Sequence, residues 1–212
     1  MNNPAHHAST YRAFTVTGRQ RFELVERVRR PPQPGQVRIR VEACGICHTD
    51  VLAVEGLRPD PSAPIVPGHE IIGVIEAIGE GAGPAWQVGD RVGVGFLGGQ
   101  DNTCESCRRG DYVNCSGQPQ TGTAVDGGYA EVTYARATGL VRIPPGLDPL
   151  ADAPLLCAGL TMYTPEPPCD DSAGQRSSSP PPPPGHRCRR WSRDSAHEAS
   201  WSSSEPPPTR SR

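Results

Sequence analysis

The amino-acid composition of the chain changes abruptly after Thr164. The 48 residues from Pro165 to Arg212 include 11 Pro, 11 Ser and 7 Arg but no Val, Ile, Leu, Phe, Met or Tyr. Such a segment cannot bury enough apolar surface to offset the conformational entropy that folding would cost it. We therefore expect one folded domain in residues 1–164, which is long enough for a single core, and a disordered Pro/Ser/Arg-rich tail in residues 165–212.

The charge balance and the hydropathy of the chain give no indication of a nucleic-acid or membrane partner. The 21 basic and 23 acidic residues nearly cancel, so that neither nucleic acid nor an anionic membrane is required as a partner. Residues 1–10 are polar and contain no apolar run of signal-peptide length, and no stretch of the sequence approaches the ~18 to 20 apolar residues that span a membrane. We expect a cytoplasmic protein, in which the 8 cysteines are metal ligands or bystanders rather than disulfides.

Short apolar segments separated by Gly and Pro dominate the first 164 residues. Their patterns predict strands at residues 37–43, 71–79, 91–94, 128–134 and 140–144, and short helices at 50–54 and 149–156. Many short strands with frequent turns indicate a β-barrel or a sandwich. The predicted fold class is therefore mainly β, with a few short helices.

Cys104, Cys107 and Cys115 form the most specific local motif. A CxxC pair places two thiolates on one tight loop, where they can chelate a tetrahedral Zn²⁺, and Cys115 supplies a third. Asp101 occupies the fourth position of this spacing, and a carboxylate can also ligate zinc. The alternative is a reduced redox pair or chance clustering, but a polar, Gly-flanked loop favours a zinc knuckle.

A second set of zinc-type side chains is scattered along the chain. Cys47 lies in the segment Cys-Gly-Ile-Cys-His-Thr-Asp at 44–50, His69 lies in Gly-His-Glu, and Cys157 lies in an apolar run. Two Cys and one His with an open fourth position are the ligand type of a catalytic zinc that polarises a substrate oxygen. Taken singly, each segment is a weak signal, because a Gly-His-Glu segment is more often a surface turn than a ligand site and a cysteine in an apolar run is more often part of the core. The argument therefore depends on their order and spacing.

Together these motifs resemble the N-terminal half of the zinc-dependent medium-chain alcohol dehydrogenases. The resemblance runs from about Thr10 to Tyr163 and rests on residues 44–50, 67–70, 88–92, 126–131 and 153–161 and on the three knuckle cysteines. It implies a GroES-like β-barrel catalytic domain, a small alcohol or aldehyde substrate, and hydride transfer to NAD or NADP. Full-length members of the family form homo-oligomers.

The resemblance also implies the ligands of two zinc ions. The catalytic zinc ligands fall on Cys47, His69 and Cys157, and the structural zinc ligands fall on Asp101, Cys104, Cys107 and Cys115.

Four further residues match family positions with roles in catalysis or in cofactor binding. Glu70 matches a carboxylate beside the zinc, and Thr49 matches the hydroxyl that takes the substrate's proton. Asp50 matches the acid that orients the ligating histidine. His48 matches a basic side chain that faces the cofactor's pyrophosphate. Cys44, in contrast, matches a position that is not a ligand.

The chain departs from the family pattern at two positions. Asp101 stands where most members have the first knuckle cysteine, so we expect a site of three thiolates and one carboxylate. Leu52 stands where some relatives have a histidine that passes the proton to solvent. This second departure affects only the outer part of the proton relay.

The sequence does not continue into the dinucleotide-binding half of the family. Residues 93–98 fit GxGxxG, but they run into the metal loop instead of a helix, and no acidic residue follows at the expected distance. We expect a frameshifted or truncated dehydrogenase that is inactive alone. For the tail, a genuine disordered terminus with a Pro-rich binding segment at residues 180–184 is the alternative. For the whole chain, the alternatives are a polyol or formaldehyde branch of the superfamily and a non-catalytic zinc-binding fragment or interaction module.

Overall fold

The computed structural model describes residues 9–162, all of which belong to one compact unit. The strands are β1 (Thr10–Gly18), β2 (Arg21–Val28), β3 (Gln36–Gly45), β4 (Glu70–Ile78), β5 (Arg91–Val94), β6 (Val132–Arg136) and β7 (Leu140–Arg142). The helices are α1 (Asp50–Val54), α2 (Glu105–Arg108), α3 (Pro149–Asp152) and α4 (Ala158–Met162), with 3₁₀ turns η1 (Tyr112–Asn114), η2 (Ala137–Gly139) and η3 (Ala153–Leu156). The expected disordered tail lies outside the described residues and stays a prediction.

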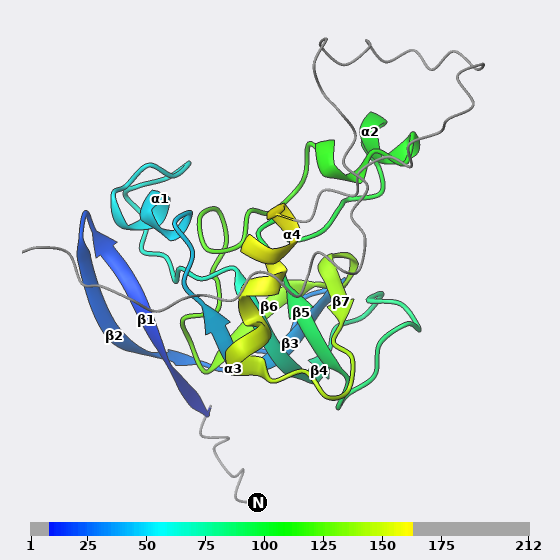
Figure 1. The fold of residues 1–212 in the computed structure, drawn as a ribbon, viewed down its shortest axis with the longest axis horizontal. Helices are drawn as coiled ribbons and strands as arrows, with labels where there is room; N and C mark the ends of the chain where they lie inside the picture. The colour runs from blue at the N-terminus through cyan, green and yellow to red at the C-terminus, as the bar shows by residue number, and fades with distance from the viewer. Residues whose placement is uncertain (1–8, 163–212) are drawn as a thin grey trace, which may run out of the picture. The chain divides into compact units, whose positions relative to one another are not determined.

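Five strands form one antiparallel sheet in the order β6-β3-β4-β5-β7, and β1 pairs with β2 in a separate hairpin (Figure 1). On β3, Val37 and Ile39 are fully buried, whereas the arginines at 38 and 40 alternate with them. Period-two alternation sends the β-branched side chains to one face, where they pack against Ile71, Ile75 and Val92 of the neighbouring strands. This packing builds the main core.

The prediction of a mainly β fold with a few short helices is confirmed. Within residues 9–162 no ladder joins the edge strands β6 and β7, so the sheet is not closed into a complete barrel by backbone pairing. No helix of this part of the chain is long and apolar enough to span a bilayer.

Two predicted elements differ in extent, and two strands were missed. The strand expected from residue 128 begins only at Val132, because the N–H groups of residues 127–129 donate to carbonyls of the loop at 66–68 and not to a neighbouring strand. The helix expected at 149–156 becomes a 3₁₀ turn after Asp152, since Pro154 has no N–H for an α-helical bond. The hairpin β1–β2 was not predicted at all.

The fold brings distant parts of the chain to one end of β3 and β4. The loop after β3 leads into α1, and η3 packs directly on β5, where a side chain on Gly93 would meet Leu156 at 2.7 Å.

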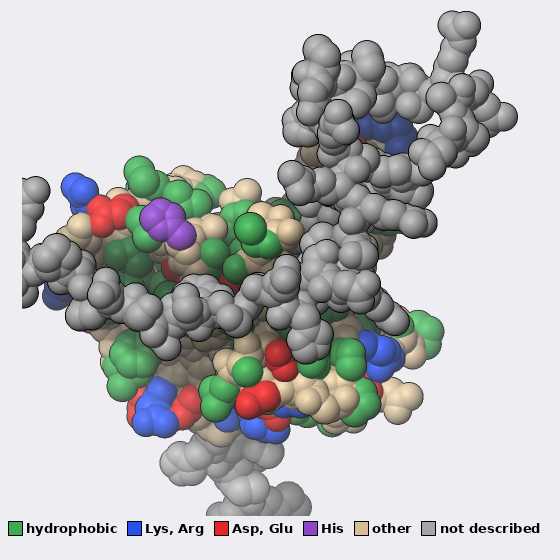
Figure 2. Space-filling view, viewed as in Figure 1, with side chains coloured by type: hydrophobic (Ala, Val, Ile, Leu, Met, Phe, Trp, Pro, Cys, Tyr) green, Lys and Arg blue, Asp and Glu red, His purple; other side chains and the backbone are tan. Residues whose placement is uncertain are grey.

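The surface formed by α3, η3 and α4 is rich in apolar side chains, and Figure 2 shows hydrophobic side chains exposed on this face. The exposed members are Leu150, Leu155, Leu160 and Met162.

Candidate metal centres

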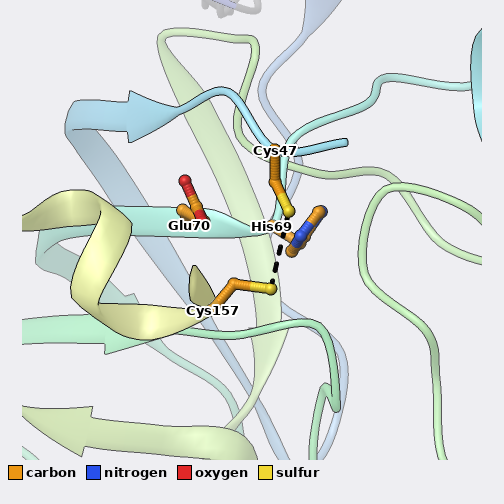
Figure 3. A group of neighbouring side chains, drawn as sticks. All are labelled: Cys47, His69, Glu70 and Cys157. Carbon is orange, nitrogen blue, oxygen red and sulfur yellow. Dashed lines mark hydrogen bonds between the residues drawn. The ribbon is translucent and has the colours of Figure 1, made fainter. Parts of the chain in front are cut away.

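Three separate segments contribute to the first candidate centre, which we call the Cys47 cluster: Cys47, His69, Glu70 and Cys157 (Figure 3). Cys47 lies in the loop after β3, His69 directly precedes β4, and Cys157 joins η3 to α4. One potential ligand atom from each residue lies within 4.8 Å of all the others. The fold therefore brings together the three predicted catalytic ligands and the carboxylate expected beside them.

The sulfur separation in the Cys47 cluster fits a shared metal ion. Cys47 Sγ and Cys157 Sγ are 3.7 Å apart, much farther than the ~2.05 Å of a disulfide bond. Two sulfurs that each lie ~2.3 Å from a tetrahedral zinc would be about 3.8 Å apart. The observed distance, at which one thiol can also donate a hydrogen bond to the other, matches the spacing of two thiolate ligands on one tetrahedral ion.

Buried polar atoms at the centre of the cluster lack partners that a cation would supply. His69 is 0% exposed and Glu70 is 1% exposed. Within residues 9–162, neither His69 Nε2 nor Glu70 Oε2 makes a hydrogen bond. An unpaired buried polar group is costly, so a donor set of two thiols, one imidazole and one carboxylate fits Zn²⁺ on both chemical and energetic grounds.

Asp50 faces His69 and is itself held by three hydrogen bonds. Its Oδ1 accepts a hydrogen bond from the backbone N–H of Gly68 (3.0 Å) and lies 3.2 Å from His69 Nδ1, at ion-pair distance but out of line for a hydrogen bond. Its Oδ2 accepts hydrogen bonds from the backbone N–H of Cys47 (3.0 Å) and from the hydroxyl of Tyr129 (2.7 Å). The arrangement leaves His69 Nε2 as the nitrogen available to a metal.

These contacts also set the ionisation of the site. Burial raises the pKa of Asp50, but His69 and the N–H and O–H donors outweigh it, and the pKa falls below its usual range. Burial likewise lowers the pKa of His69, yet the carboxylate of Asp50 and the thiol of Cys47 raise it overall. Asp50 is therefore an anion that holds the imidazole in place.

The two thiols of the Cys47 cluster differ in acidity. Burial alone would raise the pKa of Cys47, but the backbone N–H and hydroxyl of Thr49, together with His69, lower it overall. Burial and the neighbouring Cys47 raise the pKa of Cys157 to about 11. Metal binding to both sulfurs would release at least the Cys157 proton.

The second candidate centre, the knuckle cluster, consists of Asp101, Cys104, Cys107 and Cys115, whose ligand atoms also lie within 4.8 Å of one another. Cys104 Sγ accepts from the backbone N–H of Cys107 at 3.5 Å, and Cys115 Sγ accepts from that of Asp101 at 3.3 Å. The backbone N–H groups of Cys107 and Ser116 lower the pKa of Cys104 to about 7, whereas burial and the neighbouring thiols raise that of Cys107 to about 12. The loop is shaped to present sulfur atoms to one point.

Asp101 brings an ionised carboxylate to the knuckle cluster. Its Oδ1 accepts from the backbone N–H groups of Cys104 (2.9 Å) and Thr103 (2.7 Å), and these bonds hold its pKa far below the usual range. One oxygen is thus bonded to the loop backbone, whereas Oδ2 accepts no backbone hydrogen bond within residues 9–162.

Comparisons with known proteins agree with this geometry. The family model of the alcohol dehydrogenase GroES-like domain matches residues 33–145. The chain belongs to this family. It is 43% identical over 141 residues to an alcohol dehydrogenase of Geobacillus stearothermophilus, covering 66% of this chain and 41% of the relative. It is 42% identical over 132 residues to the alcohol dehydrogenase patD of Aspergillus clavatus, covering 62% of this chain and 34% of the relative.

Solved structures of alcohol dehydrogenases share the fold. The cinnamyl alcohol dehydrogenase SbCAD4 of Sorghum bicolor is similar with a TM-score of 0.63 and 32% identity, over 73% of this chain and 46% of that one. A cobalt- and zinc-bound thermostable alcohol dehydrogenase of Pyrobaculum aerophilum is similar with a TM-score of 0.62 and 29% identity, over 69% of this chain and 45% of that one. The chain spans less than half the length of these relatives.

The remaining predicted residues of this GroES-like domain lie around the Cys47 cluster. Thr49 precedes α1, its Oγ1 lies 3.7 Å from Cys47 Sγ, and it lines a cavity of about 610 Å³ together with Cys157. His48 is exposed on the same turn, as is Leu52 on α1. Cys44 packs against the main core and belongs to neither cluster.

The GxGxxG segment does not lie in the structural context of a dinucleotide-binding site. The Gly93–Gly98 motif begins in β5 and continues into a loop, and the next helix in the described chain is α2. The segment therefore lacks the strand–turn–helix context of a dinucleotide site.

Tyr129, which donates a hydrogen bond to Asp50, was not predicted as a site residue. Its only sequence signal was membership of the 126–131 motif.

Proposed function

We propose that this chain supplies the zinc-binding catalytic domain of an alcohol dehydrogenase and that the Cys47 cluster holds its catalytic zinc. The observation that carries the proposal is the convergence of two thiols 3.7 Å apart on a buried imidazole whose Nε2 has no partner among residues 9–162. When bound, Zn²⁺ supplies a Lewis acid that polarises the oxygen of a small alcohol or aldehyde. Support comes from relatives that are named alcohol dehydrogenases.

The residues around the proposed metal each have a task in this scheme. Thr49, at the wall of the cavity, accepts the proton of the substrate hydroxyl, and Asp50 keeps His69 oriented. The apolar side chains of Leu155, Leu156 and Leu160 line the same cavity and give it an apolar wall. Glu70 accepts a hydrogen bond through Oε1 from the backbone N–H of Ala158 (3.3 Å), which ties the Cys157 segment to β4.

The knuckle cluster is proposed to hold a second, structural zinc. Three thiols and the Oδ2 of Asp101 would complete its tetrahedron, with no open position for substrate. Its four ligands lie within fifteen residues of the chain, so this ion would stabilise the loop rather than take part in the reaction.

The hydride acceptor in the proposed reaction is NAD or NADP. A similar Escherichia coli enzyme has been solved with NADH and a similar Helicobacter pylori enzyme with NADP(H), and we propose that His48 meets the pyrophosphate of such a cofactor. Hydride transfer requires the reacting carbons to be held ~3 to 3.5 Å apart. We propose that this positioning comes from the part of the relatives without a counterpart in residues 9–162, and that the chain alone has little or no turnover.

A cytoplasmic location belongs to the same proposal. Six cysteines of the described chain are free thiols, and a reducing compartment preserves thiols of this kind.

A chimera tests the proposed function. Residues 1–163 replace the corresponding part of the Geobacillus stearothermophilus alcohol dehydrogenase, and alcohol-dependent reduction of NAD and NADP is measured. We expect turnover that Cys47→Ser abolishes and that the chain alone does not show. Zinc binding by a folded chimera without turnover would contradict the catalytic role and favour a zinc-binding module.

A further inference from the structure

Tyr129 donates a hydrogen bond to Asp50, the carboxylate that faces His69. Its hydroxyl donates to Asp50 Oδ2 at 2.7 Å, while the other oxygen of the same carboxylate faces His69 Nδ1 at 3.2 Å. The hydroxyl also lies 3.4 Å from the carbonyl oxygen of Gly45, at the end of β3. The phenol therefore holds Asp50 from the side opposite the imidazole.

The backbone around Tyr129 holds the segment that carries His69. The N–H of Tyr129 donates to the carbonyl of Pro67 at 3.0 Å, and the N–H of Gly128 donates to that of Gly68 at 2.9 Å. A third bond joins the N–H of Gly127 to the carbonyl of Val66 at 2.7 Å. These bonds fix the turn immediately before His69, so one segment braces both the imidazole and its carboxylate partner.

The ring of Tyr129 adds a packing contact to the same turn. Gly68 has φ +95°, and a Cβ at this position would come within 2.6 Å of Tyr129 Cδ1 and 2.7 Å of Cys44 Sγ. The ring therefore lies directly against the backbone next to His69.

Tyr134 differs from Tyr129 because its hydroxyl contacts neither metal cluster. The hydroxyl of Tyr134 accepts from the N–H of Arg30 (2.8 Å) and donates to its carbonyl (3.0 Å), outside both metal clusters.

We infer that Tyr129 is a positioning residue of the Cys47 cluster, which acts through Asp50 to keep His69 Nε2 aimed at the metal. The inference rests on the proposed zinc site. Without the phenol oxygen, Asp50 keeps one backbone donor on each oxygen, the N–H of Cys47 on Oδ2 and the N–H of Gly68 on Oδ1. The carboxylate loses one of its three hydrogen bonds and is held less firmly against His69. Groups that orient metal-ligating histidines typically contribute 10- to 100-fold to metal affinity, and Tyr129, one step farther out, should contribute about 10-fold.

The test is the zinc affinity of the two clusters in the full chain, measured by competition with a chromophoric chelator. Tyr129→Phe removes one oxygen and keeps the ring, and Tyr134→Phe is the matched control. Zinc should pass to the chelator in two phases, one for each cluster. The phase that is lost in Cys47→Ser is assigned to the Cys47 cluster. We expect Tyr129→Phe to weaken the Cys47 cluster about 10-fold, to leave the knuckle cluster unchanged, and to keep the unfolding temperature of the zinc-free protein close to that of the parent.

A double-variant cycle shows whether Tyr129 acts through Asp50. In an Asp50→Ala background, Tyr129→Phe should change zinc affinity less than twofold, because the carboxylate it holds is gone. Unchanged affinity in Tyr129→Phe overturns the inference, and so does an equal effect in the Asp50→Ala background. Loss of both clusters or of the folded structure in Tyr129→Phe also overturns it, since that result indicates a general structural role. If the parent chain lacks the Cys47-cluster phase altogether, the proposed function itself fails.

Discussion

Gly68 is the backbone position at which one added methyl group should damage the Cys47 cluster. It has φ +95°, which L side chains rarely adopt, and a Cβ there would meet Tyr129 Cδ1 at 2.6 Å and Cys44 Sγ at 2.7 Å. Both neighbours are held by the fold, since Tyr129 is bonded to Asp50 and Cys44 is packed on the main core. In Gly68→Ala, either the ring or the turn before His69 must therefore move.

Gly89 separates the cost of backbone strain from the cost of steric conflict. It has the same φ of +95°, and a Cβ there would meet nothing within 4 Å in the described part of the chain. Gly89→Ala should thus bear only the left-handed strain, about 1 to 2 kcal/mol. Gly68→Ala should bear that strain plus about 1 to 3 kcal/mol of overpacking, for a total of about 2 to 5 kcal/mol.

Thermal unfolding of the zinc-free proteins measures this difference. One kcal/mol corresponds to about 2 to 4 °C in a domain of this size, so Gly68→Ala should unfold at least about 2 °C below Gly89→Ala. In the zinc-loaded proteins, Gly68→Ala should also lower the affinity of the Cys47 cluster while Gly89→Ala leaves it unchanged. Equal unfolding temperatures and equal zinc affinities for the two variants would refute the reasoning.

Three further outcomes follow from the same contacts. Asp101→Ala should weaken zinc binding by the knuckle cluster at least about 10-fold, because a direct ligand contributes no less to affinity than an outer-shell partner. Asp101→Cys should keep or increase that affinity. If Asp101→Ala resists a chelator as well as the parent does, Asp101 is a loop residue and not a ligand. Ile39→Ala, at a fully buried core position, should cost about 2 to 5 kcal/mol in urea unfolding, and Ile46→Ala, at a side chain that is 86% exposed, less than about 0.5 kcal/mol; similar costs for both would contradict the core described here. A chain ending at Thr164 should keep its unfolding temperature and its zinc, since residues 165–212 lack the apolar residues of a core; loss of either would assign the tail a part in the fold.

The sequence predicted the strands of the main sheet because their side chains alternate between core and solvent. Val37 and Ile39 on β3 are buried between arginines, and this pattern is local. The hairpin β1–β2 gave a weaker signal, because apolar side chains lie on both of its faces: Tyr11 and Val16 are buried, whereas Phe14 and Leu24 are more than half exposed. Its turn also lacks an Asn-Gly or Asp-Gly pair, and Gln20 takes the positive φ there (+55°).

The two metal centres also differ in how far the sequence alone predicted them. Spacing alone predicted the knuckle cluster, whose ligands share one loop, whereas the Cys47 cluster depends on contacts between residues as far apart as Cys47 and Cys157 and was predicted only through the family resemblance. The role of Tyr129 could not be predicted, because the alternation of residues 128–134 indicates a strand. Its hydrogen bonds to Pro67 and Asp50 are decided by tertiary structure.

Zinc content is the most direct test of the central claim, that one fold holds two separate metal centres. Purified protein, analysed for metal by mass spectrometry, should contain between one and two zinc equivalents per chain. Cys47→Ser should lose the equivalent bound by the Cys47 cluster and Cys104→Ser the one bound by the knuckle cluster, each without loss of the other. A folded chain free of metal after purification and after zinc reconstitution would contradict the account of both centres.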